Sequence, residues 1–160
     1  MPMALRLTVA VFLVIASGVV RADASPDPDA AAKIVAVTHL RRGDALRDRG
    51  RLDEAVREYD LGILAFPGAA NLYASRGAAR YLQKNYRGAA EDFSVYLTAA
   101  PSDTKILLLR GLSRSLQNPE DVKGACADLL RIQALGVSLK SAGIGGMDKY
   151  CQGQEGWGGN

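Results

Sequence analysis

Residues 73–101 read YASRGAARYLQKNYRGAAEDFSVYLTAAP, and this stretch decides the fold. Its spaced small and aromatic positions are Gly77, Ala89, Phe93 and Pro101. The same residue types occur 34 residues earlier, at Gly43, Ala55, Tyr59 and Pro67. Self-similarity at one fixed period indicates stacked copies of a single supersecondary unit.

A third copy follows, with its second half displaced by two residues. The dipeptide Arg-Gly marks all three units at a spacing of 34 residues, at Arg42-Gly43, Arg76-Gly77 and Arg110-Gly111. The third unit continues with Ala125 and Leu129, and no proline closes it. We therefore place the repeats at residues 36–69, 70–103 and 104–137.

These units resemble the tetratricopeptide repeat, whose bulky first position corresponds here to His39, Tyr73 and Leu107. The resemblance implies an all-α, right-handed solenoid of three helical hairpins with a C-terminal capping helix over residues 138–151. Helices are predicted at residues 29–49, 53–66, 70–84, 87–99, 103–117 and 119–134. Asn118 is the expected N-cap of the last of these, with Pro119 in its first turn.

The N-terminal residues 1–24 have the pattern of a secretory signal peptide. A single Arg6 precedes the uncharged stretch 7–20, and Ala22-Asp23-Ala24 offers small residues for cleavage. Cleavage after Ala22 and retention as an anchor are the alternatives. We expect a periplasmic or secreted protein, a lead-in over residues 25–35, and a flexible tail at 152–160.

Composition excludes several classes of function. The chain has 160 residues, 48% of them hydrophobic, and a net charge of +3, which is too small for a nucleic-acid-binding surface. There is no phosphate-binding glycine loop, no HExxH and no CxxC motif. One histidine, His39, and two cysteines make a poor zinc site, and we interpret His39 as a packing residue. We expect no enzyme activity, no cofactor, no metal, and no membrane contact after signal cleavage.

The arginine of each Arg-Gly pair has an acidic residue at a matching place in the next helix. The predicted ion pairs within hairpins are Arg42 with Glu58, Arg76 with Asp92 and Arg110 with Asp128. The alternative is a ladder of free arginines that binds an acidic partner.

In the tetratricopeptide family the leading helix of each hairpin lines a concave groove. The resemblance places in that groove Leu40, Asp44, Arg47, Ala74, Ala78, Tyr81, Leu108, Leu112 and Ser115. Family members that clamp a chaperone's C-terminal carboxylates use lysine and asparagine where this chain has Leu40 and Asp44. Only Lys105 matches that set, so the resemblance does not predict this ligand.

The resemblance also implies a disulfide between Cys126 and Cys151. In the family the position of Cys126 faces the next leading helix, which here is the cap, and the ending of the chain looks like that of some exported repeat proteins. The alternative is two buried thiols that only pack together.

Two classes of function remain. The first is a non-catalytic scaffold that binds a segment of another protein on its concave face. The second is a structural or assembly accessory of the cell envelope, without a groove ligand. The sequence leaves the partner and the oligomeric state open.

Overall fold

The structure is a computed structural model that describes residues 27–118, 122–139, 151 and 153. Over those residues the chain forms six α-helices and no strand, in agreement with the predicted all-α class. The helices are α1 (Pro28–Arg47), α2 (Leu52–Ala65), α3 (Ala70–Leu82), α4 (Tyr86–Ala99), α5 (Thr104–Gln117) and α6 (Lys123–Ala134).

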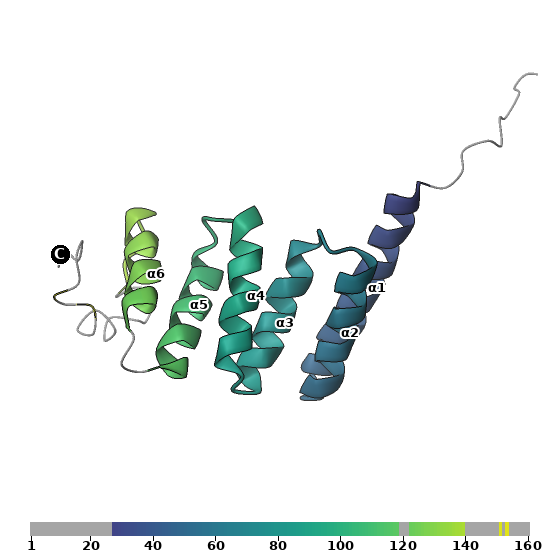
Figure 1. The fold of residues 1–160 in the computed structure, drawn as a ribbon, viewed down its shortest axis with the longest axis horizontal. Helices are drawn as coiled ribbons and strands as arrows, with labels where there is room; N and C mark the ends of the chain where they lie inside the picture. Colours follow the sequence, from purple (N-terminus) through teal and green to yellow (C-terminus); the bar gives the residue numbers. More distant parts are fainter. Residues whose placement is uncertain (1–26, 119–121, 140–150, 152, 154–160) are drawn as a thin grey trace, which may run out of the picture.

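Consecutive helices form three antiparallel hairpins that stand in a row in chain order (Figure 1). The hairpins are α1–α2, α3–α4 and α5–α6, and contacts of α2 with α3 and of α4 with α5 join them. Helix α1 is the longest, with 20 residues, and its N-terminal turns extend beyond the end of α2 (Figure 1). The result is the predicted solenoid of three helical hairpins.

Each of the first two hairpins closes around a glycine that faces an aromatic ring. A Cβ atom on Gly43 would lie 2.7 Å from Cδ1 of Tyr59, and one on Gly77 would lie 2.8 Å from Cε1 of Phe93. Both rings are fully buried. The helices can therefore approach this closely only because glycine has no side chain at the crossing point.

Local sequence signals set most helix ends. Asp27, Asn85 and Asp103 each accept a hydrogen bond from a backbone N–H in the first turn of the following helix. Between the helices of the first hairpin, Gly50 adopts a φ of +75°, and Lys84 adopts +63° at the equivalent place in the second. The same left-handed turn thus forms twice, once with the residue that favours it and once without.

The start of the last helix differs from the prediction. Helix α6 begins at Lys123, not at residue 119, and its N-cap residue is Val122. Asn118 instead ends α5, where its own N–H donates to the carbonyl oxygen of Arg114. All other helix boundaries lie within two residues of the prediction.

The buried side chains form two clusters along the array. The N-terminal cluster contains Tyr59 and Leu72 with three alanines, and the C-terminal one contains Leu107, Leu129 and Ile132 with both cysteines. The signal peptide predicted at residues 1–24, most of the predicted cap and the tail lie outside the described residues. Within the described residues, no helix is long and apolar enough to span a membrane.

Candidate functional site

The three leading helices form one continuous layer. Helix α1 contacts α3, and α3 contacts α5, whereas α2, α4 and α6 make no contacts with one another in the described part of the chain. Neighbouring leading helices are therefore closer together than neighbouring second helices. The array curves with α1, α3 and α5 on its inner side.

The nine predicted groove residues all belong to this inner layer, and each is partly buried. They are Leu40, Asp44 and Arg47 on α1, Ala74, Ala78 and Tyr81 on α3, and Leu108, Leu112 and Ser115 on α5. A residue at the base of an open surface has this intermediate exposure, since one side packs on the hairpin and the other faces solvent.

The first unit contributes a polar part of this surface that is already occupied. The hydroxyl of Tyr59 donates to Oδ1 of Asp44 at 2.9 Å, and Arg47 lies 3.0 Å from the same oxygen. Burial and this hydrogen bond raise the pKa of Tyr59 above its ordinary value. Asp44 therefore holds a core tyrosine in place.

The second and third units contribute a mainly apolar part of the inner surface. Ala74 and Ala78 have short side chains, so the surface of α3 is shallow there. Tyr81 makes an edge-to-face contact with Tyr86, with 5.5 Å between the ring centroids. On α5, Leu108 packs against the C-terminal cluster. Ser115 donates its hydroxyl to the carbonyl oxygen of Leu112, so its polar group is satisfied inside the helix.

A predicted ion pair forms in the second hairpin as part of a three-residue network. Arg76 donates through Nε and Nη2 to the two oxygens of Asp92, at 3.0 and 2.7 Å. Arg80 donates to the same carboxylate at 2.9 Å, and Asp92 is only 3% exposed. Burial lowers the pKa of Arg76, but its hydrogen bonds to Asp92 and Asp60 outweigh that effect and raise it.

The third hairpin repeats this network with its two-residue insertion. Arg110 donates through Nε and Nη2 to Asp128 at 3.1 and 2.5 Å, and Arg114 donates to the same carboxylate at 2.9 Å. The guanidinium groups of these hairpins are thus held by carboxylates of their own repeat. This arrangement contradicts the alternative of a free arginine ladder for the second and third repeats.

The predicted pair of Arg42 with Glu58 does not form. Oε2 of Glu58 lies 2.8 Å from Nδ1 of His39 instead, and Arg42 is exposed without an ion pair to any described residue. The position that holds Arg80 and Arg114 in the other repeats is Leu46 here. His39 is therefore a hydrogen-bonded residue of the α1–α2 interface, a partner that sequence reasoning missed.

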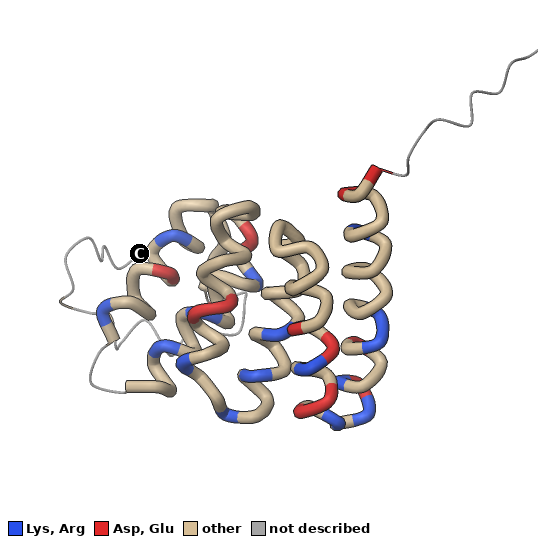
Figure 2. The backbone as a smooth tube through the Cα atoms, turned by 45° about the vertical axis from the view of Figure 1, so that its right-hand side comes forward, with Lys and Arg blue, Asp and Glu red and all other residues tan. Residues whose placement is uncertain are grey.

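The same arginines also join neighbouring hairpins, which the sequence analysis did not predict. Arg76 reaches back to Asp60 on α2 at 2.5 Å, and Arg110 reaches Ser94 on α4 at 3.3 Å. Asp60 and Ser94 are 34 residues apart, so the repeat period itself was the available signal. Figure 2 shows positions of both charge signs spread along the array, as such pairing between helices requires.

The cysteines are disulfide-bonded. Cys126 on α6 and Cys151 have Cα atoms 5.4 Å apart, and both are buried in the C-terminal cluster. The bond attaches residue 151 to the third repeat. The capping helix predicted at residues 138–151 falls mainly on residues 140–150, which lie outside the described residues.

No group of three or more metal-binding side chains comes together among the described residues. No protein-family model and no curated protein matches the sequence.

Solved structures, by contrast, are similar to this one. The first TPR of Spaghetti (RPAP3), bound to the HSP90 peptide SRMEEVD, aligns with a TM-score of 0.64 and 22% identity, over 74% of this chain and 94% of that one. The second TPR of the same protein, bound to the same peptide, aligns with a TM-score of 0.60 and 25% identity, over 66% and 95%. With three hairpins, a 34-residue period and glycine–aromatic crossings, the chain has the tetratricopeptide-repeat fold.

Proposed function

We propose that this protein is a non-catalytic scaffold that binds a segment of another protein on the inner face of its leading helices. The observation that carries the proposal is the partly accessible layer of α1, α3 and α5, which is mainly apolar over its second and third units. Helical-hairpin arrays use such extended concave surfaces for binding. The two similar solved domains are described with a bound peptide, which supports the same class of function.

The acidic chaperone peptide of those domains is not the ligand that we propose for this groove. A clamp for terminal carboxylates needs donors on the first leading helix, and the matching places here hold Leu40 and Asp44. Asp44 is negative and already accepts from Tyr59. The inner face is better suited to an apolar helix or extended segment, anchored at Ala74, Ala78, Tyr81, Leu108 and Leu112.

Export to the periplasm or the extracellular space is part of this proposal. It rests on the signal-like residues 1–24, and the bond between Cys126 and Cys151 supports it because disulfides persist in oxidising compartments. The intact mass of the protein recovered from its native compartment tests export. A mass that starts at Ser25 agrees, and a mass that includes the apolar stretch 7–20 contradicts cleavage.

Affinity capture from an envelope extract tests the groove. Leu112→Glu and Tyr81→Glu place a charge on the inner face and should abolish capture while the helical circular dichroism stays unchanged. Val95→Glu is the matched control, because Val95 is exposed on the second helix α4. Equal loss with all three variants, or no loss with either groove variant, contradicts the proposal.

A further inference from the structure

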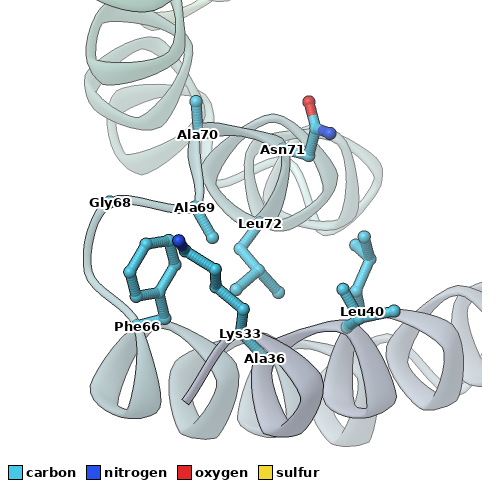
Figure 3. Close-up of a pocket in the computed structure, with 10 residues that line it drawn as sticks. Lys33, Ala36, Leu40, Phe66, Gly68, Ala69, Ala70, Asn71 and Leu72 are labelled. Atoms are coloured by element: carbon cyan, nitrogen blue, oxygen red, sulfur yellow. The ribbon is translucent and has the colours of Figure 1, made fainter. Parts of the chain in front are cut away.

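A pocket of about 300 Å³ lies at the N-terminal end of the inner layer (Figure 3). Helix α1 forms one wall with Lys33, Val37 and Leu40, and Leu72 of α3 faces it. Phe66 and the turn from α2 to α3 close the remaining side (Figure 3). Its size is at the lower end of the range of about 300–1,000 Å³ that is typical of ligand pockets.

The pocket uses a part of α1 that the other leading helices lack. Helix α1 begins at Pro28, ahead of the repeat boundary at residue 36, whereas α3 and α5 begin at their boundaries. Lys33 lies on this extra part of α1. The places that match Lys33 in the next two repeats are Pro67 and Pro101, which lie outside helices.

The lining is mainly apolar, with the amide of Asn71 and the single charge of Lys33 as its polar side chains. Leu40, Phe66 and Leu72 present carbon atoms to the space, and no acidic residue lines it. The ammonium of Lys33 lies 5.4 Å from the centroid of the Phe66 ring, and Figure 3 shows its side chain lying across the pocket beside that ring. The structure shows no carboxylate on this ammonium among the described residues.

We propose that this pocket takes one large apolar side chain of a partner segment that carries a carboxylate beside it. The apolar walls would hold an aromatic or branched aliphatic side chain, and Lys33 would pair with the neighbouring carboxylate at the pocket mouth. This inference rests on the proposed function and deepens it. Leu40 lines both the pocket and the groove, so a segment bound in the groove would end here.

Asp44, the acidic residue of the groove, is too far from the pocket to repel the ligand's carboxylate. Asp44 lies 11 residues along α1 from Lys33, which at the helical rise corresponds to about 16 Å. Its charge is also paired with Arg47. For a carboxylate at the pocket mouth, the attraction of Lys33 therefore outweighs the repulsion of Asp44.

The test uses the full oxidised chain and synthetic decapeptides with blocked ends. Each peptide has a central Phe or Ala, next to an Asp or an Asn, in an otherwise constant Ser-Gly background, and fluorescence anisotropy measures binding. We expect the Phe–Asp peptide to bind best. Lys33→Gln should reduce the preference for Asp over Asn by about five- to tenfold and leave the preference for Phe over Ala.

Two substitutions at one exposed position distinguish an effect of charge on peptide binding from a loss of folding. Val37 lines the pocket and is 46% exposed, so both Val37→Glu and Val37→Lys should fold. Val37→Glu would pair with Lys33 one turn away and weaken the Phe–Asp peptide about tenfold, whereas Val37→Lys would retain it. Val35→Glu adds the same charge on the same helix outside the pocket and should change nothing.

The outcomes separate this inference from the proposed function. Binding that depends on Phe and Asp and is lost with Val37→Glu supports the pocket. Peptide binding that is lost with Leu112→Glu but not with Val37→Glu or Lys33→Gln overturns the pocket and leaves the groove standing. Absence of Phe–Asp peptide binding to the wild-type chain also overturns the pocket, and the capture experiment still decides the groove.

Discussion

Alanine at the glycine of each leading helix should destabilise the first two repeats and spare the third. The added Cβ of Gly43→Ala lies 2.7 Å from Cδ1 of Tyr59, and that of Gly77→Ala lies 2.8 Å from Cε1 of Phe93. In the third repeat a leucine replaces the aromatic residue. The Cβ of Gly111→Ala there meets nothing closer than a backbone oxygen at 3.4 Å.

The magnitude follows from two opposed contributions to the free energy of unfolding. Alanine is favoured over glycine inside a helix by about 1 kcal/mol. Overpacking a close-packed interior costs about 1–3 kcal/mol, and the rings of Tyr59 and Phe93 are fully buried with little room to move. We expect Gly43→Ala to lose about 2 kcal/mol and Gly77→Ala about 1 kcal/mol, whereas Gly111→Ala gains up to about 1 kcal/mol.

Urea unfolding followed by circular dichroism measures these three values. A second variant tests the stated cause, because Tyr59→Leu gives the first repeat the residue type that the third has at this position. Gly43→Ala combined with Tyr59→Leu should be more stable than the sum of the single effects by about 1 kcal/mol or more. Additive effects, or a Gly111→Ala loss as large as that of Gly43→Ala, would refute the packing argument.

Three further predictions concern the buried polar groups and the disulfide. Asp92→Asn should destabilise by about 3 kcal/mol, because two arginines then share a neutral acceptor, and unchanged urea unfolding would contradict this. Reducing the bond between Cys126 and Cys151, 25 residues apart, should lower the free energy of unfolding by about 3 kcal/mol, measured with and without a phosphine reductant. The raised pKa of Tyr59 means that its contribution to stability is complete below about pH 10 and declines as the pH rises further. Phenolate absorbance should therefore titrate at higher pH in the folded wild type than in the unfolded chain, and Tyr59→Phe should reduce that difference.

Sequence alone determined the helices and their pairing into hairpins. The 34-residue spacing of Gly43 and Gly77, with Tyr59 and Phe93 sixteen residues after each, requires a repeated close crossing. Five of the six helices begin within one residue of the predicted start. The exception is α6, whose start was inferred from Asn118 and Pro119 as a capping pair. Asn118 ends α5 instead, and α6 begins at Lys123.

The same periodicity predicted two of the three ion pairs correctly. Arg76 and Asp92 recur as Arg110 and Asp128, and both sets meet across their hairpins. A repeated spacing predicts a repeated contact when the surroundings are also repeated. The surroundings are repeated in the second and third hairpins, where a second arginine donates to each carboxylate.

Only the tertiary structure decided the contacts for which several groups compete. Glu58 could pair with Arg42 or with His39, and it pairs with His39, which lies one turn closer to the N-terminus of α1. Likewise, Lys33 lies in a part of α1 that no repeat contains, and it becomes a pocket wall only because the turn at Phe66 folds back beside it. The sequence period records what neighbouring hairpins have in common, whereas partner choice depends on distances between groups that no period relates.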